Sequence, residues 1–433
     1  MIRPSARLLA GLSLVALLAV ASAVSSWLAG PAWACLVLVL ALFALDLRLT
    51  LSEARVQVAC ALPPRARLGE PFNVRYSLHN PTSRALEVWL IDERAPALGG
   101  DLQLGPLALA ASSTTCIESC WTPCGRGIVA LGPIHGLCRS VLGLFERRFQ
   151  GRAPSLTLAV LPNAGTSRDR ALGHDLLAGT RPRRSRGEGL ELDALRPFTQ
   201  GDDPRHVDWR ASARAQQLIV RTFREERRQS VVLVVDTGRM MASQVEGLSK
   251  LDHALNTVVA LARAALAQGD RVGFAAFDAN VRSWVPVSDP RRGMGLLLEA
   301  TLPLAASARE SSFRVLTELL DAQQRKRSLI VILSDFVESA DALQLEGYLG
   351  RLSRRHVVLL VALRDRLLSE LDAPRPALDE AAIYRRLVLQ DLVVERRLVL
   401  RRLDALGVHT LDLLPEQSRG PALGRYLELR RAL

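Results

Sequence analysis

The densest group of potentially reactive side chains is the stretch from Asp202 to Trp209, which reads DDPRHVDW. Its residue types allow two kinds of catalysis. Asp202, His206 and Asp208 offer ligands for a metal ion, and paired carboxylates can act as general acid and general base. A metal-dependent hydrolase is therefore one hypothesis for this chain.

The same stretch also has a structural interpretation, because Asp-Pro turns with a nearby arginine are common in loops. In that case Asp202 and Asp203 cap a turn or a helix, Arg205 and Arg214 offset their charge, and Trp209 anchors the segment to a sheet. Short spacing alone is weak evidence for catalysis. We therefore favour the structural role.

A further acid, Asp236, directly follows the most strand-like run in the chain, Val231 to Val235. A run of aliphatic residues of this length predicts a strand that is buried in a parallel sheet, and the small residues Thr237 and Gly238 predict a loop after it. Ligands on open α/β sheets bind at the carboxyl ends of the strands. Asp236 is therefore a candidate binding residue.

The elements that would position these acids alternate between strand and helix from residue 230 to the end, which predicts a doubly wound, mostly parallel sheet. The expected strands are Val231 to Val235, Arg271 to Phe277, Leu329 to Leu333, Val357 to Ala362 and Val408 to Leu413. The expected helices are Lys250 to Gln268, Arg292 to Thr301, Phe313 to Gln324, Ala340 to Arg354 and Ala381 to Ala405.

The preceding part of the chain has a different pattern. Short alternating runs at Phe72 to Leu78 and Leu86 to Leu90, separated by turn residues, predict an antiparallel domain over residues 51–162, which we expect to be an immunoglobulin-like sandwich of about seven strands. Residues 163–229 then form a linker that carries the acidic stretch. Its Pro- and Arg-rich part, Arg181 to Arg186, is expected to be a solvated connector.

The N-terminus is expected to enter a membrane, because no charged residue occurs from Leu8 to Leu45. Gly30-Pro31 is expected to break this run into an apolar segment of about 22 residues and one of about 16, against the roughly 20 that a spanning helix needs. Asp46 and Arg48 would then lie at the interface. The arginines on both flanks predict a two-pass hairpin over residues 1–50, in the inner membrane, with the soluble domains cytoplasmic. They are Arg3, Arg7, Arg48, Arg55, Arg65 and Arg67.

A cleaved signal peptide is the alternative, because the first segment ends in the small residues Ala21-Ser22-Ala23. The six cysteines favour the hairpin, since they show no disulfide-dense pattern. Cys116, Cys120 and Cys124 lack the partner pair of a zinc site, so we expect reduced thiols. The net charge of +12 suits an anionic membrane surface, and the 5% aromatic content argues against nucleic-acid binding.

The motif region resembles the bacterial domain-of-unknown-function family fifty-eight, in which a GDD-x-R-x-(I/V)-D-W-x-x-(S/T)-A-R motif precedes a von Willebrand factor A-like domain. The matching residues are Gly201, Asp202, Asp203, Arg205, Val207, Asp208, Trp209, Ser212, Ala213 and Arg214. The resemblance implies an α/β fold with a von Willebrand factor A-like domain at 230–433. It also makes the motif a candidate docking surface.

The resemblance also implies a possible Mg²⁺ or Mn²⁺ site. Such domains hold the ion through an Asp-x-Ser-x-Ser loop, a hydroxyl from a second loop and a later Asp, because hard cations prefer oxygen ligands. Asp236 and Asp335 match the two acids, and Ser312 or its neighbour Ser311 matches the hydroxyl. The two serine positions of the loop hold Gly238 and Met240, which have no side-chain oxygen. We therefore expect a degenerate loop, kept for its shape.

Common catalytic signatures do not occur. The chain has no G-x-x-x-x-G-K-[ST], H-E-x-x-H or G-x-S-x-G motif. We therefore expect an interaction or adaptor protein rather than an enzyme. The family resemblance implies that its partner is a MoxR-type AAA+ ATPase, served in the assembly or maturation of envelope or metal-dependent complexes. The hydrolase hypothesis and nucleic-acid binding through the arginine clusters are the alternatives.

Overall fold

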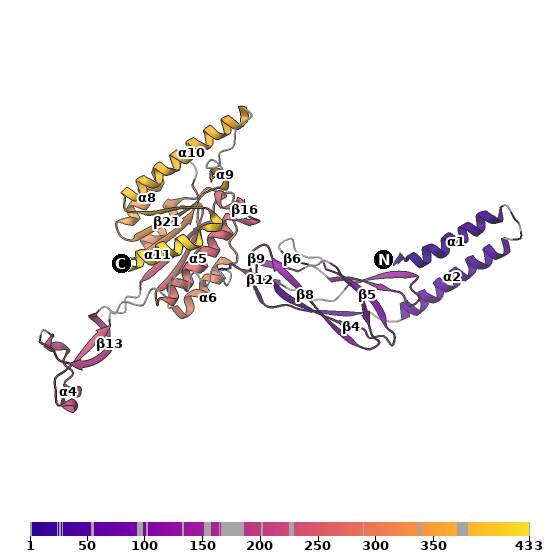
Figure 1. Ribbon diagram of the computed structural model, residues 1–433, viewed down its shortest axis with the longest axis horizontal. Helices are drawn as coiled ribbons and strands as arrows, with labels where there is room; N and C mark the ends of the chain where they lie inside the picture. The colour runs from indigo at the N-terminus through magenta and orange to yellow at the C-terminus, as the bar shows by residue number, and fades with distance from the viewer. Residues whose placement is uncertain are drawn as a thin grey trace. The chain divides into compact units, whose positions relative to one another are not determined.

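The computed structural model describes residues 2–432, except 24, 26, 28, 53–55, 93–97, 101–102, 132–133, 151–156, 164, 166–185, 201, 225–228, 289, 337–338 and 370–379. The architecture is mixed α/β, with several sheets (Figure 1). The chain divides into an N-terminal unit, Met1–Leu161, and a C-terminal unit, Pro162–Leu433. Most of the predicted connector at Arg181 to Arg186 lies outside the described residues.

The N-terminal unit begins with two apolar helices, α1 (Ala6–Ser22) and α2 (Ala29–Ser52), which lie side by side in Figure 1. The predicted lengths are wrong, because the first helix has 17 residues and the second has 24. Gly30 and Pro31 lie in the first turn of α2, where a proline costs no hydrogen bond. This pair therefore stands at the start of the second helix and does not end the first.

Only one helix among the described residues is long and apolar enough to cross a membrane, and it spans Ala29–Thr50 within α2. The helix α1 is apolar but shorter. Both present large exposed apolar side chains, among them Leu17, Trp33 and Val37. This exposure suits lipid as the surrounding medium, so α2 is a candidate membrane anchor.

Asp46 lies near the end of α2 and is completely buried, although it was expected at the membrane interface. Its carboxylate accepts hydrogen bonds from Ser140 Oγ at 2.6 Å, from the Leu142 amide at 2.9 Å and from the Leu144 amide at 3.3 Å. The last turns of α2 are thereby joined to the turn between two strands of the following domain.

Strands make up the rest of the N-terminal unit. Five of them pair in the order β1-β11-β10-β5-β7, four in the order β2-β4-β8-β6 and three in the order β3-β12-β9. The predicted strands at Phe72 and Leu86 are confirmed as β4 and β5. The bounds are β1 Ile2–Pro4, β2 Gln57–Ala61, β3 Arg65–Arg67, β4 Phe72–His79, β5 Leu86–Asp92, β6 Leu98–Gly100, β7 Gln103–Leu109, β8 Thr114–Pro123, β9 Gly127–Ala130, β10 Ile134–Arg139, β11 Phe145–Gln150 and β12 Thr157–Leu161.

The C-terminal unit is built on a sheet of six strands in the order β19-β18-β15-β20-β21-β22. The edge strand β19 is antiparallel and the other strands are parallel. Chain order reverses at β15, so the ends of β15 and β20 form the crevice where ligands of such sheets bind. The bounds are β15 Ser230–Asp236, β18 Arg271–Phe277, β19 Val281–Ser288, β20 Leu329–Ser334, β21 Val357–Leu363 and β22 His409–Leu413.

Helices cover both faces of this sheet. Alternate side chains of each strand point to opposite faces, and the apolar side chains on each face pack against helices. Val231, Leu233 and Val235 of β15 pack in one core with α5, α6 and α11, whereas Val232 and Val234 pack in a second core with α7, α8 and α10. The bounds are α5 Lys250–Ala267, α6 Pro290–Thr301, α7 Phe313–Gln323, α8 Ser339–Ser353, α9 Arg366–Ser369, α10 Glu380–Ala405 and α11 Arg419–Ala432. Short pieces lie at η3 Arg239–Ala242, β16 Gln244–Val245, β17 Leu248–Ser249 and η5 Pro415–Gln417.

The motif region forms a separate hairpin, which we call the arm and define as residues 186–224. Its two strands, β13 (Arg186–Pro197) and β14 (Ile219–Arg224), pair antiparallel. Between them lie a 3-10 turn, η2 (Pro204–His206), and a short helix, α4 (Trp209–Ala215). Figure 1 shows the hairpin with α4 at one end.

Candidate functional site

The strand β15 places Asp236 at the carboxyl edge of the sheet with only 2% of its surface exposed. One carboxylate oxygen accepts hydrogen bonds from the Gly238 amide at 2.7 Å and from the Ser311 hydroxyl, and the other accepts one from Ser334 Oγ at 2.6 Å. Burial raises the pKa of Asp236 to about 6, although these three hydrogen bonds oppose the shift. Its carboxylate is therefore fully enclosed by protein donors.

Asp335 follows β20, the neighbouring strand, and is also buried. One of its oxygens lies 2.6 Å from Lys250 Nζ, and the other lies 3.0 Å from a guanidinium nitrogen of Arg396. Lys250 itself is 0% exposed and also contacts Asp365 at 2.9 Å. The cation at this edge of the sheet is thus a lysine side chain.

Arg396 lies in α10 and contacts both Asp335, which follows β20, and Asp412 of β22. Its guanidinium donates to the Phe336 carbonyl at 2.5 Å and to Asp412 at 3.1 Å, and lies over the Phe336 ring. We call Asp236, Asp335, Asp365, Lys250 and Arg396 the carboxylate–lysine cluster. Its two buried cations both pair with Asp335, and Lys250 also pairs with Asp365, so the buried carboxylate of Asp335 has the counter-charges that buried charges require.

Gly238 explains the tight closure of the loop after β15. A side chain at this position would overlap the Ser311 hydroxyl and would come within 3.1 Å of the Arg309 carbonyl. The first serine of an ion-binding loop therefore has no room here. Its place is taken by Ser311, which bonds directly to Asp236.

The cluster does not fit a divalent ion. Both oxygens of Asp335 already bond to cations, those of Asp236 accept three hydrogen bonds, and Gly238 leaves no space for another oxygen ligand. Across the described part of the chain, no group of three or more His, Cys, Asp or Glu side chains is placed to hold a metal ion.

The hydroxyl predicted for this site was placed one residue too far along the chain. Ser312 precedes α7 without a side-chain capping bond, and its amide donates to the Asp278 carbonyl at 3.0 Å. Ser311 instead reaches Asp236, so the structure assigns the contact to the neighbour that the sequence left open. Asp236 and Asp335 lie at the carboxyl ends of the adjacent strands β15 and β20.

The acids of the arm have three separate structural roles. Asp202 pairs with Arg196 and accepts hydrogen bonds from the Thr199 amide at 2.8 Å and hydroxyl at 2.9 Å, and the Arg196 bond lowers its pKa. Asp203 caps η2 by accepting the Arg205 amide at 2.9 Å. Each acid therefore closes its own turn.

Asp208 is the N-cap of α4. It accepts the Arg210 and Ala211 amides at 3.1 and 3.0 Å and pairs with Arg221 at 2.9 Å. The Ala211 bond contributes most to the lowering of its pKa. The ion-pair partners of Asp202 and Asp208 are thus Arg196 and Arg221. Arg205 and Arg214 had been expected to offset the charge of Asp202 and Asp203, but Asp202 pairs with Arg196 instead.

Trp209 was predicted to anchor the segment to a sheet, and that prediction is wrong, because 69% of its surface is exposed. It begins α4 on the side that faces solvent, while Val207 and Val220 form the small buried core of the arm. Arg205 and Arg214 are exposed as well. Gly201 lies outside the described residues.

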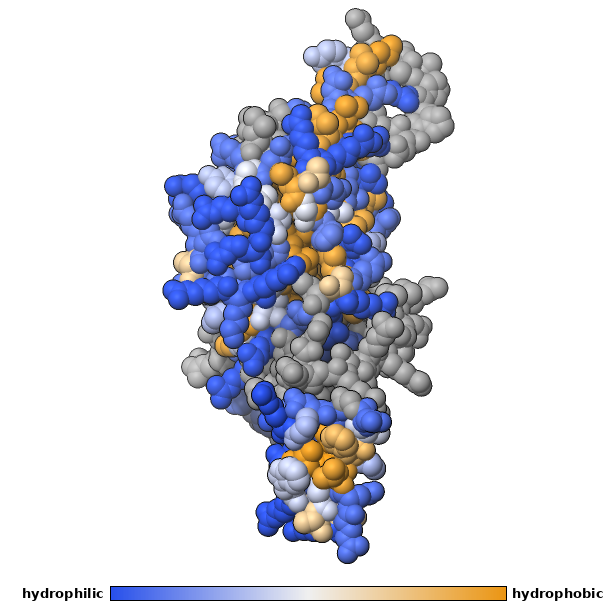
Figure 2. Space-filling model, turned by 90° about the vertical axis from the view of Figure 1, so that its left-hand side faces the viewer, coloured by the Kyte–Doolittle hydropathy of each residue, from blue (hydrophilic) through white to orange (hydrophobic). Residues whose placement is uncertain are grey.

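Hydrophobic residues gather on the surface of the arm in Figure 2, to which Leu195 and Leu218 contribute, each 48% exposed. A second apolar stripe runs along the outer face of α10. Its exposed side chains are Ile383, Tyr384, Leu387, Val388, Val394 and Leu398. The arm and the helix α10 therefore each carry an exposed apolar surface.

Sequence reasoning missed Lys250, Arg396 and Asp365. One signal was available, because Lys250 is one of two lysines among 56 basic residues. A lysine that stands at the start of a helix in an arginine-rich chain marks a position where a compact ammonium fits and a guanidinium does not. Arg396 and Asp365 carry no comparable signal.

The relatives found among known proteins are described as uncharacterized. Uncharacterized protein Rv1480 of Mycobacterium tuberculosis and Uncharacterized protein Mb1516 of Mycobacterium bovis are each 27% identical to this chain over 181 residues, or 41% of it. The match covers 56% of each relative, so the chain spans little more than half the length of these relatives.

Two solved structures show weak likeness to this chain. The conserved hypothetical protein BatB from Bacteroides thetaiotaomicron is 14% identical, with 47% of this chain and 100% of that chain covered, at a TM-score of 0.32. WR4, a C. elegans MSP family member, is 9% identical at a TM-score of 0.17, with 25% of this chain and 99% of that chain covered. No conclusion about the fold follows from scores this low.

The family model described as "Protein of unknown function DUF58" matches residues 194–381, a range that begins in the arm and ends in α10. It thus includes the motif and most of the carboxylate–lysine cluster. On this match, the segment 194–381 of the chain is assigned to the DUF58 family of proteins of unknown function.

Proposed function

We propose that this protein is a membrane-anchored adaptor that binds a partner protein through the arm and has no catalytic activity of its own. The observation that carries the proposal is that the acids and the tryptophan of the motif have different surroundings. Its acids are committed to caps and ion pairs, while Trp209 remains 69% exposed. Exposed tryptophan is among the residues that contribute most to protein interfaces.

The partner proposed is a MoxR-type AAA+ ATPase, as the family resemblance implies. The exposed residues of the arm include Trp209, Arg205, Arg210 and Arg214. An aromatic side chain among arginines suits a partner surface with an apolar pocket bordered by carboxylates. The proposed process is the assembly or maturation of envelope or metal-dependent complexes.

The proposal includes the finer assignment of both units. The strand order of the C-terminal sheet, with its antiparallel edge strand β19, supports a von Willebrand factor A-like domain whose ion site has become a carboxylate–lysine cluster. The antiparallel sheets of the N-terminal unit support an immunoglobulin-like sandwich. The two apolar helices support a two-pass hairpin with cytoplasmic domains.

The first test is an affinity purification of the tagged full-length protein from its own cells in detergent, with and without ATP and Mg²⁺. We expect an AAA+ ATPase to co-purify, and we expect Trp209→Ala to reduce its recovery at least tenfold without changing the melting temperature. Ile128→Ala is the matched control, because Ile128 is 67% exposed but lies in β9 of the other unit.

Other outcomes are equally informative. If Trp209→Ala retains the ATPase and Leu387→Ala on α10 loses it, the docking surface is the stripe on α10. If no ATPase co-purifies with the unaltered protein under either condition, the adaptor proposal fails. The Asp202 to Asp208 stretch would then be assayed for hydrolase activity.

A further inference from the structure

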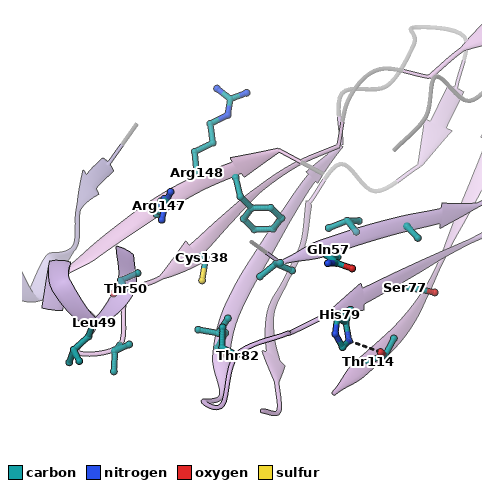
Figure 3. A pocket seen from close by; sticks show the side chains of 16 residues that line it. Leu49, Thr50, Gln57, Ser77, His79, Thr82, Thr114, Cys138, Arg147 and Arg148 are labelled. Atoms are coloured by element: carbon teal, nitrogen blue, oxygen red, sulfur yellow. Dashed lines mark hydrogen bonds between the residues drawn. The ribbon is translucent and has the colours of Figure 1, made fainter. Parts of the chain in front are cut away.

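The N-terminal unit contains a cavity of about 750 Å³ that the proposed function does not use. It lies between the β2-β4 edge of one sheet and β10-β11 of another, and the last turn of α2 closes one end. In Figure 3, Thr50, Cys138 and Arg147 lie toward the α2 end, and Gln57, His79 and Thr114 lie at the other. The volume falls in the range of small-molecule sites.

The walls of this cavity are largely apolar. Val58 and Leu86 come from different sheets, and Val56 and Val141 also line the cavity. A cavity with such walls is suited to a hydrocarbon chain, since apolar surface is removed from water on both sides.

One cation, Arg147, faces the apolar interior. Along β11 it shares a face with Phe145, which is fully buried, and with Phe149, because alternate residues of a strand point the same way. It pairs in register with Cys138, whose thiol pKa burial raises to about 11. Arg147 forms no ion pair with any side chain that the structure describes. A guanidinium that faces an apolar interior is stabilised when an anion binds to it.

A second, independent feature is Thr50 of α2. It lines the cavity, is 8% exposed, and its hydroxyl has no hydrogen-bond partner among the described residues. Buried polar groups of proteins nearly always have a partner, so this hydroxyl is available to a ligand.

The place of the cavity in the chain points to the ligand. Leu49 and Thr50 line it, and Thr50 is the last residue of the candidate membrane span. If α2 crosses a bilayer, this end of the cavity lies at the level of the lipid head groups. The exposed Arg148 borders the same opening.

We propose that this cavity binds one anionic phospholipid, with a hydrocarbon chain between the sheets and the phosphate at Arg147 and Thr50. The lipid would contact both the anchor helix and the strands of the N-terminal unit. The packing of these strands against α2 would therefore depend on the lipids of the surrounding membrane. This inference rests on α2 being a membrane anchor and is independent of the partner of the arm.

The test uses the delipidated full-length protein in detergent, titrated with phosphatidylglycerol, with phosphatidylcholine of the same chains, and with inorganic phosphate, and followed by native mass spectrometry. We expect one phosphatidylglycerol per chain, held at least tenfold more tightly than phosphatidylcholine. Arg147→Gln should abolish this preference. Arg75→Gln, which removes an exposed charge paired with Glu118 on the same unit, should preserve it.

A second variant tests the apolar part of the site. Cys138→Phe fills the cavity and should weaken both lipids at least tenfold, and Val141→Trp narrows the opening from an exposed position if Cys138→Phe does not fold. Equal retention of both lipids by the unaltered protein, or an unchanged preference in Arg147→Gln, would overturn the proposal. Binding of inorganic phosphate that excludes no lipid would show a phosphate site instead. All of these readouts are separate from ATPase recovery.

Discussion

At the scale of single residues, Lys250 is a buried cation that joins two acids of the C-terminal unit. Its ammonium contacts Asp335 and Asp365 and is completely buried. Lys250→Met keeps most of the volume but leaves two acids short of a counter-charge, which costs roughly 3–5 kcal/mol for a buried pair. We expect chemical denaturation to show this loss, whereas Arg314→Met, in an exposed pair with Glu318, should change stability by less than about 0.5 kcal/mol.

The same variant tests the replacement of a metal by lysine. Without the ammonium, the carboxylates of Asp335 and Asp365 become available to a hard cation. Millimolar Mg²⁺ or Mn²⁺ should therefore raise the melting temperature of Lys250→Met and leave that of the unaltered protein within about 1 °C. A clear rise in the unaltered protein, reversed by a chelator, would contradict an ion-free cluster.

Asp236 predicts an unusual pH dependence. Burial raises its pKa from 3.8 to about 6, so between these values the folded chain holds a proton that the unfolded chain has released. Stability from this group is thus greatest below about pH 4 and is lost as the pH rises through about 6. The loss is on the order of 3 kcal/mol.

Asp236→Asn removes this titration and can keep the three hydrogen bonds, because the amide oxygen accepts from Ser311 and Gly238 and the amide nitrogen can donate to Ser334. We expect urea unfolding to show that the free energy of unfolding of the variant rises relative to that of the unaltered protein from pH 4.5 to 6.5. Above pH 6.5 this difference should stay constant. A difference that stays constant with pH would rule out the raised pKa.

At the scale of elements, Asp46 links the end of α2 to the turn between β10 and β11. Asp46→Ala would remove the acceptor of Ser140 and of the Leu142 and Leu144 amides, and each unsatisfied buried donor costs about 1–3 kcal/mol. We expect hydrogen exchange in detergent to quicken in the segment 140–145. Leu45→Ala, at a 50% exposed neighbour, should leave exchange there unchanged, and equal exchange in both variants would deny Asp46 this role.

At the scale of the whole molecule, the hairpin hypothesis predicts which side of the membrane the domains occupy. Cys116, Cys120 and Cys124 are exposed and free, so they can serve as natural reporters in the N-terminal unit. A membrane-impermeant maleimide should not label them in intact spheroplasts and should label them after lysis. Labelling before lysis would place the domain outside and favour a cleaved first segment with α2 as the anchor.

Much of the fold could be predicted from local patterns. The buried strands β15, β18, β20 and β21 are continuous apolar runs, and the helices between them have a helical spacing of apolar residues, so their positions were found to within a few residues. The edge strand β19 was missed. Its residues are mostly exposed or half-buried, and a half-buried edge strand has a weaker sequence pattern.

The chain's own order of residues thus determined the membrane-like N-terminus, the alternating α/β region and the motif of the arm, because each depends on residues close together in sequence. Only the tertiary structure decided what the acids do. Lys250 meets Asp335 and Asp365 across 85 and 115 residues, and Ser311 meets Asp236 across 75. Such contacts depend on strand order and on burial, which place a lysine beside Asp335, an acid that the family resemblance had assigned to a degenerate ion site.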